Sequence, residues 1–193
     1  MEKRLDGKKV AILVADGFEQ VELTAPKEAL EAAGATTEIV SPADHDVQGW
    51  NHDEKADMFH VDMPLDRARS DDYDALLLPG GVRNPDQLRQ LTRALEFVDG
   101  FFATGKPVAA ICHASWTLIE AGVVDGRKIT SWPSLKTDLL NAGANWVDRD
   151  VVVDKGLVSS RKPADLPAFN KKMIDEFAEG RRQKRPTLLR QVK

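Results

Sequence analysis

The sequence predicts a single α/β domain with a mostly parallel β-sheet and helices on both of its faces. Short apolar runs typical of buried strands alternate along the chain with helical stretches. Crossover units produce such alternation, because they place parallel strands side by side and stack helices on the sheet. The length of 193 residues suits one domain with a complete core, and no linker or repeat divides the chain. We therefore expect one domain at residues 1–180, followed by a basic C-terminal tail at residues 181–193.

The expected elements alternate from the N-terminus onward. Apolar runs predict strands at residues 8–15, 36–40, 74–79, 107–111 and 128–131, and a hairpin at residues 151–160. Helices are expected at residues 20–33, 85–104, 113–121 and 135–142, and a final helix begins near Pro163. Residues 47–62 predict an irregular hairpin inserted between the second and third strands. In an open sheet of this kind, sites form beyond the carboxyl ends of the strands, near a switch in strand order.

Charge is distributed unevenly along the chain, whose net charge is −4. Residues 181–193 contain six basic side chains and no acidic one, so the preceding residues are acidic overall. Only this charge suggests a nucleic-acid role, because the tail lacks the interleaved aromatic side chains of a stacking surface. A solvated or loosely docked end is the more common role of such a tail, and we do not expect a nucleic-acid partner.

The cysteine content and the apolar runs indicate a cytoplasmic protein. Cys112 is the only cysteine, which excludes an internal disulfide and is consistent with a reducing compartment. The first residues do not form a convincing signal peptide. No apolar run approaches the roughly 18 residues needed to cross a bilayer. We therefore expect a cytoplasmic location and no membrane partner.

The first strand is followed by the sequence "DGFEQVEL", which contains two carboxylates. Glu19 and Glu22 are three residues apart and share one face of a helix. Acidic side chains in a first helical turn are also favoured by the helix dipole without any function, and this is the more common explanation for Glu19. Glu22 lies farther into the apolar part of the helix. A carboxyl buried there has a raised pKa and donates a hydrogen bond when it is protonated.

The third strand ends in "LPGGVRNPDQLR". Gly80 and Gly81 permit a tight turn with backbone N–H groups directed inward, which is one way to bind an oxyanion. A plain strand-to-helix turn explains the same pair, and the pattern of a phosphate-binding loop is absent. Asp86 follows a proline at the expected helix start, where a carboxylate is common without any function.

The fourth strand ends in "AAICHAS", where Cys112 is followed directly by His113. A nucleophile at a sharp strand-to-helix turn projects from the sheet, and small neighbouring residues let the turn close. The helix N-terminus behind the turn favours a thiolate, and His113 is an adjacent base or cation. From the residues alone, a reactive thiol and an inert buried cysteine remain evenly balanced interpretations.

Several other residues are candidates for binding, but a structural role is the more common one for each. The histidines His45, His52 and His60 fall in or near the hairpin insert, and with one cysteine they lack the spacing of a zinc site. We therefore expect no metal and no cofactor. Arg161 follows a strand end, where it lines the site or, more often, forms a structural ion pair. The aromatic residues that we assign to core or interface packing are Trp132, Trp146 and Phe169.

Taken together, these motifs resemble the PfpI-type intracellular protease family. The resemblance is carried by "DGFEQVEL", "DALLLPGG", "NPDQLR", "GKPVAAICHAS", "GRKITSWPSLKTDLLNAGANWVD" and "VVVDKGLVSSRKPADLPAF". It covers roughly residues 8–178. The family belongs to the superfamily of the parkinsonism-associated protein deglycase and the class I glutamine amidotransferase domains. The resemblance implies a flavodoxin-like three-layer sandwich that forms dimers or larger homo-oligomers.

The resemblance also implies roles for particular residues. Cys112 corresponds to the nucleophile, His113 to the adjacent base and Glu22 to a carboxyl that hydrogen-bonds the thiolate. Asp86 matches a carboxylate that reaches the site from a neighbouring subunit, so the active site is composite. Backbone groups that correspond to the oxyanion site are those of Gly80, Gly81 and Ala114. Candidate lining residues are Glu19, Trp116 and Arg161.

This sequence departs from the family pattern at three places. The elbow continues Ala114-Ser115-Trp116 where PfpI-like proteins usually read Gly-Pro-Gln, and a tryptophan there narrows or covers the site. The insert "VQGWNHDEKADMFHVD" replaces the usual glycine-rich hairpin, and the basic tail extends past the usual end.

The resemblance implies a stress-related cysteine hydrolase that acts on peptides or on small aldehyde adducts, as a peptidase or as a deglycase or glyoxalase. The alternative is a non-enzymatic redox sensor, in which Cys112 oxidises to a sulfinate that a protonated Glu22 stabilises.

Overall fold

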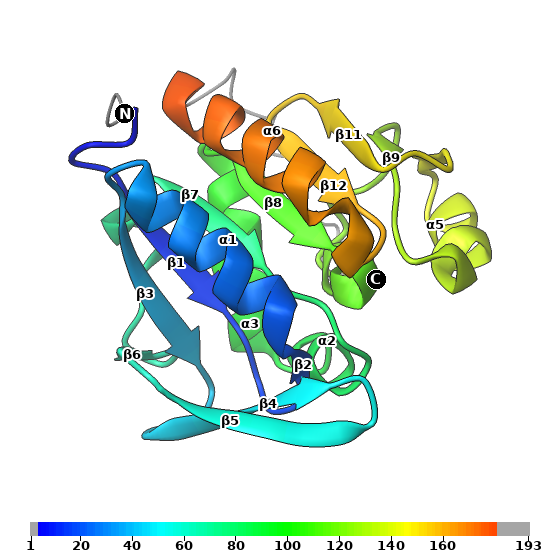
Figure 1. Ribbon diagram of the computed structural model, residues 1–193. Helices are drawn as coiled ribbons and strands as arrows, with labels where there is room; N and C mark the ends of the chain where they lie inside the picture. The colour runs from blue at the N-terminus through cyan, green and yellow to red at the C-terminus, as the bar shows by residue number, and fades with distance from the viewer. Residues whose placement is uncertain (1–3, 181–193) are drawn as a thin grey trace.

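A computed structural model describes residues 4–180, so the predicted basic tail at residues 181–193 lies outside the described residues. A seven-stranded sheet forms the centre of the molecule, in the spatial order β11, β12, β8, β7, β1, β3, β6 (Figure 1). Only β11 runs antiparallel to its neighbour. The strands of this sheet are β1 (Lys9–Leu13), β3 (Thr36–Ser41), β6 (Met63–Pro64), β7 (Ala75–Leu78), β8 (Val108–Ile111), β11 (Val151–Asp154) and β12 (Leu157–Ser160).

Helices cover both faces of this sheet, which confirms the predicted flavodoxin-like α/β sandwich. Figure 1 shows α1 and α6 together on one face, while α3 lies on the other. The α-helices are α1 (Gln20–Ala32), α2 (Arg83–Leu88), α3 (Thr92–Ala103), α4 (Ser115–Glu120), α5 (Lys136–Asn141) and α6 (Leu166–Glu179). Single 3₁₀ turns are η1 (Ser70–Asp72), η2 (Cys112–Ala114), η3 (Pro133–Leu135) and η4 (Pro163–Asp165). No helix within residues 4–180 is long and apolar enough to cross a membrane.

The core consists of two apolar layers, one on each face of the sheet. Successive side chains of a strand point to opposite faces. In β1, Ala11 and Leu13 therefore pack on the α3 side, while Val10 and Ile12 pack on the side of α1 and α6. All four side chains are fully buried, which explains why this strand is a continuous apolar run in the sequence.

Two smaller sheets lie outside the central one. The predicted insert forms a hairpin of β4 (Asp46–Asn51) and β5 (Glu54–His60), and β4 also pairs with the short β2 (Phe18–Glu19) that precedes α1. The predicted strand at residues 128–131 is shorter, β9 (Lys128–Ile129). It pairs with β10 (Asn145–Trp146) instead of joining the central sheet.

The predicted helix at residues 85–104 is two helices in the structure, α2 and α3. Leu91 has an extended backbone, with φ −100° and ψ 109°, and this conformation interrupts the helical hydrogen-bond ladder. The sequence did not reveal the break, because buried side chains occur on both sides of it, at Leu88 and Ala94. The final helix also starts later than predicted, since Pro163 begins the turn η4 and α6 follows from Leu166.

The order of strands locates the site. β1 lies between β3 and β7, and the chain passes from β1 to β3 on one side before it returns to β7 on the other. Connections that leave neighbouring strands in opposite directions open a crevice at their carboxyl ends. The turns after β1, β7 and β8 meet at this edge, and they contain the three predicted strand-end motifs.

Candidate active site

Cys112 occupies a strained position directly after β8. Its backbone φ is +64°, in the left-handed region that non-glycine residues rarely adopt. The next residues form η2 and then α4, so the chain turns sharply from strand to helix, as at a nucleophile elbow. The backbone N–H of Trp132 donates to the Cys112 carbonyl at 3.2 Å and supports this conformation. The side chain projects toward the crevice and is 6% exposed.

The Glu22 carboxyl lies beside this cysteine and is fully buried. The backbone N–H of Gly80 donates to Oε2 at 2.9 Å, and Oε1 has no nitrogen or oxygen partner among the described residues. Burial raises the pKa of Glu22 to about 8, and the charge of Glu19 adds to the effect. Glu22 is therefore mostly protonated at neutral pH, in hydrogen-bond contact with the Cys112 thiol.

Gly80 is required because the backbone passes very close to both side chains. A Cβ atom at this position would lie 2.5 Å from Glu22 Oε2 and 2.6 Å from Cys112 Cβ. Gly81, at φ +77°, turns its own N–H toward the thiol and the carboxyl. The Gly80 N–H is occupied by Glu22, so of the predicted oxyanion donors on this turn it is the Gly81 N–H that faces the sulfur.

Asn84 fixes this turn to the end of β1. Its side-chain amide donates to the carbonyls of Pro79 and Gly80 at 2.9 and 3.0 Å, and its Oδ1 accepts from the Ala15 N–H at 2.7 Å. The side chain is fully buried. Asn84 therefore holds together the two strand ends that border the crevice, a role that the sequence analysis did not assign to it.

The His113 ring faces the cysteine. Nδ1 lies 3.2 Å from the Cys112 sulfur, and the ring is held between Trp116 and Trp132, with ring centroids 5.2 and 5.6 Å away. Burial lowers the pKa of His113 to about 4, so the imidazole is neutral at pH 7 and is able to accept a proton.

The protonation state of Cys112 differs from the sequence-based expectation, in which the thiolate was favoured. Burial raises the pKa of Cys112 above its ordinary value, and the charge that Glu22 carries when ionised adds to this. The backbone N–H groups of Gly81 and His113 act in the opposite direction. Only the short turn η2 and the six-residue α4 stand behind the cysteine, so the helix dipole there is small. The sulfur therefore keeps its proton until a base removes it.

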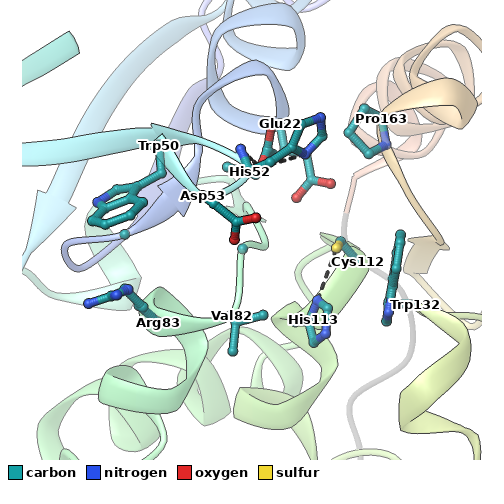
Figure 2. Close-up of a pocket in the computed structure, with 13 residues that line it drawn as sticks. Glu22, Trp50, His52, Asp53, Val82, Arg83, Cys112, His113, Trp132 and Pro163 are labelled. Carbon is teal, nitrogen blue, oxygen red and sulfur yellow. Dashed lines mark hydrogen bonds and ion pairs between the residues drawn. The ribbon is translucent and has the colours of Figure 1, made fainter. Parts of the chain in front are cut away.

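These groups border a pocket of ≈ 470 Å³ (Figure 2). Cys112, His113 and Glu22 form one wall, with Trp132 beside them. The hairpin insert contributes Trp50, His52 and Asp53, and in Figure 2 Trp50 and Asp53 lie across from Cys112 and His113. Val82 and Arg83, from the turn after β7, also line the pocket. The insert therefore contributes directly to the pocket.

Glu19 lines the pocket next to His52. Its Oε2 accepts the His52 backbone N–H at 3.0 Å and lies 3.7 Å from His52 Nδ1. The His52 side chain is 84% exposed, and its backbone φ is +55°. Glu19 therefore anchors the tip of the hairpin over the crevice.

Five predicted site residues do not line the pocket: the backbone candidates Gly80 and Ala114, and the side chains of Asp86, Trp116 and Arg161. Asp86 pairs with Arg89, the residue that follows its helix α2, Nε to Oδ1 at 3.0 Å. Trp116 stands behind the His113 ring and donates to Asp138 at 3.0 Å, so it does not cover the sulfur. Arg161 forms ion pairs with Asp148 and Asp165 at 2.7 and 2.9 Å, the structural role given above as the more common one.

The sequence analysis missed most of the residues on the far side of the pocket. Trp132, expected in core or interface packing, is 37% exposed and stacks on His113. The sequence analysis assigned no role to Trp50, Asp53 or Arg83. Their only signal was position, since they lie in the insert and in the turn after the third predicted strand. Within residues 4–180, no cluster of His, Cys, Asp or Glu has the arrangement of a metal site.

The fold and the site define a class of protein: an α/β sandwich with a cysteine at a strand-to-helix elbow, an adjacent histidine and a buried carboxyl. Within that class, the chain belongs to the DJ-1/PfpI family, whose model matches residues 8–176. The family match covers most of the chain and includes all three strand ends that form the site.

Relatives in this family have several names. The chain is 42% identical to the putative cysteine protease YraA of Bacillus subtilis, covering 87% of this chain and 97% of that protein. It is 42% identical to the deglycase PH1704 of Pyrococcus horikoshii (86% and 97%) and to general stress protein 18 of Bacillus subtilis (87% and 96%). The crystal structure of Drosophila melanogaster DJ-1beta is similar, with a TM-score of 0.80, 28% identity and coverage of 89% and 90%.

The raised pKa of Glu22 leads to a prediction about how the free energy of unfolding depends on pH. Its pKa rises from 4.5 in the unfolded chain to about 8 in the folded protein, so between these values only the folded state holds the proton. The contribution of Glu22 to the stability of the fold is therefore fully present below the unfolded pKa and is lost as pH rises toward 8, by up to about 1.4 kcal/mol per pH unit.

Urea unfolding of wild type and Glu22→Gln at about pH 5.5 and about pH 7.5 measures this slope. Wild type should lose more stability between the two pH values than Glu22→Gln, which cannot ionise. The matched control, Glu120→Gln at an exposed position on α4, should keep the wild-type slope. Equal slopes for wild type and Glu22→Gln would contradict the assignment.

Proposed function

We propose that this protein is a cysteine-dependent hydrolase that acts on small carbonyl compounds or their adducts, with deglycase-like or peptidase activity. The observation that supports it most directly is the 3.2 Å contact between the Cys112 sulfur and His113 Nδ1, at a strained elbow that opens into a pocket. Relatives named deglycase and putative cysteine protease support the same class of chemistry.

In the proposed mechanism, His113 is the general base. Neutral His113 takes the thiol proton as the Cys112 sulfur attacks the carbonyl carbon of the substrate. The Gly81 N–H, which faces the sulfur, stabilises the negative charge that develops on the carbonyl oxygen, and Ala114 is the second candidate donor. Glu22 contacts the thiol in its protonated form. It donates a hydrogen bond to the sulfur and avoids placing a second negative charge beside a thiolate.

We further propose that Asp86 of a second copy of this chain completes the site in a homo-oligomer. Asp86 lies outside its own pocket and 45% of its side chain is exposed, so it is available to a neighbouring subunit. Val82, which lines the pocket, is 54% exposed and adds apolar surface on this side. A carboxylate arriving at this side would orient the ring nitrogen of His113 that does not face the sulfur.

A second candidate function is a redox sensor, favoured by one specific observation. The carboxyl of Glu22 contacts the Cys112 sulfur and is mostly protonated at neutral pH. A protonated carboxyl there would donate a hydrogen bond to a sulfinate oxygen and stabilise the oxidised cysteine. The sensor and the hydrolase require the same residues, so substitutions alone do not separate the two functions. Measurements of turnover do, because only the hydrolase converts a substrate.

The hydrolase proposal predicts that turnover depends on Cys112. Wild type should convert methylglyoxal adducts or a peptide substrate, and Cys112→Ala should lose at least about 10³-fold in rate. His113→Ala should lose about 10²-fold, because general base catalysis contributes that much. Steady-state assays with both substrates measure this.

Equal rates for wild type and Cys112→Ala would end the hydrolase proposal. A folded wild type without turnover that gains two oxygen atoms at Cys112 in mild peroxide, measured by intact mass, would instead support the sensor.

The composite site predicts complementation between two weakened variants. Cys112→Ala and Asp86→Asn should each be impaired alone. In a mixed dimer, one site would combine an intact Cys112 with Asp86 of the partner subunit. Random mixing of equal amounts should therefore restore about a quarter of the wild-type sites.

Activity measured after subunit exchange tests this expectation. The control mixes Asp86→Asn with a chain carrying both substitutions, which offers no intact pair and should stay impaired. Absence of recovery in the first mixture, with mixed dimers demonstrated by mass spectrometry, would place Asp86 outside the partner's site.

A further inference from the structure

Arg83 is held in a defined position on the pocket wall. Its guanidinium carbon lies 4.5 Å from the centre of the Trp50 ring, which comes from the hairpin insert. Its aliphatic stem lies against Gly17: a Cβ atom there would be 2.5 Å from Arg83 Cβ and 3.0 Å from Cδ. Gly17 has φ +84°, so both its conformation and the missing side chain make room for this arginine. Two segments distant in sequence thus position one exposed cation.

The charge of Arg83 is not neutralised within the described part of the chain. Within residues 4–180, no carboxylate lies within 4.0 Å of its guanidinium, and its side chain donates no hydrogen bond. Stacking on an aromatic ring occupies the flat face of a guanidinium and leaves the N–H groups along its edge free. Those groups match the two oxygens of a carboxylate or phosphate.

The other charged groups of the pocket do not replace such a ligand. Glu19 is engaged with His52, and Glu22 is mostly protonated. Asp53 lines the pocket but forms no ion pair with Arg83. Figure 2 shows Arg83 and Trp50 together on one side of the pocket, with Cys112 and His113 on the other. A ligand that spans the pocket therefore meets a thiol at one end and a cation at the other.

We infer that Arg83 and Trp50 form an anion-binding subsite, which holds a carboxylate or phosphate group of the substrate while its carbonyl carbon reaches Cys112. This inference rests on the proposed function for the carbonyl part of the substrate. The anion-binding part of the inference depends only on whether anionic compounds bind in the pocket in preference to neutral ones. It selects acidic carbonyl compounds over neutral ones of the same size.

Two maleimides of different charge test the subsite without requiring turnover. N-ethylmaleimide is neutral, and N-(2-carboxyethyl)maleimide has the same reactive ring with a carboxylate at the end of its chain. In each case the sulfur adds to the ring C=C bond, the thiol proton is lost, and the neighbouring ring carbon takes a proton from water. Cys112 is the only cysteine, so the rate of loss of free thiol reports on this site alone.

The measured quantity is the rate constant for the anionic reagent divided by that for the neutral one, normalised to the same ratio for 2-mercaptoethanol. Wild type should favour the anionic reagent, and Arg83→Gln should lower the ratio by about tenfold. Asp53→Asn should raise the ratio, because it removes a negative charge from the pocket wall. Arg69→Gln, which removes a charge from an exposed arginine that does not line the pocket, should leave it unchanged.

A purely structural arginine would alter both rates together and leave the ratio as it was, so an unchanged ratio in Arg83→Gln overturns the inference. Protection of Cys112 by acetate or by inorganic phosphate then shows which anion the subsite accepts, and protection by neither also overturns it. If the ratio behaves as expected but no carbonyl substrate is turned over, the proposed function fails while the subsite stands.

Discussion

The contact between the buried Glu22 carboxyl and the Gly80 backbone N–H is the interaction on which the rest of the site depends. It joins the first helix to the turn after β7, at the place where the sheet opens. Because the Glu22 carboxyl is buried, it keeps its proton. Because Gly80 has no side chain to block the way, the same carboxyl reaches the Cys112 sulfur. A charged group there would oppose formation of a thiolate, whereas a protonated one supports it. The state of this one carboxyl therefore sets the chemistry available to the cysteine.

Cys112 has a strained backbone conformation that contacts with neighbouring residues hold in place. The left-handed backbone at Cys112 is unfavourable for a residue with a side chain, and it persists because neighbouring groups fix it. The Trp132 N–H holds the Cys112 carbonyl, and two indole rings hold His113 with its Nδ1 toward the sulfur. Burial raises the pKa of the thiol and lowers that of the imidazole, so a protonated thiol lies next to a neutral base. The hairpin insert faces this assembly and shapes the other half of the pocket.

The sequence was sufficient to predict the fold class, the order of elements and the strand ends that meet at the site. Those features follow from apolar runs and small residues at fixed places along the chain. The break at Leu91 was not predictable, because buried positions continue through it. The roles of Trp50, Arg83 and Trp132 depend on contacts between segments far apart in sequence. The pKa of Cys112 was misjudged for a related reason, because burial in three dimensions outweighs the effect of a short helix.

The most direct test of the central claim is the infrared spectrum of the Glu22 carboxyl. Ordinary carboxyl groups are ionised at about pH 6, so a protonated carboxyl signal there that is present in wild type and absent in Glu22→Gln belongs to Glu22. The account predicts that this signal is present at about pH 6, that it disappears with a midpoint of about 8, and that it shifts in Cys112→Ala. A spectrum without this signal at about pH 6 would show that Glu22 is ionised and would contradict the account.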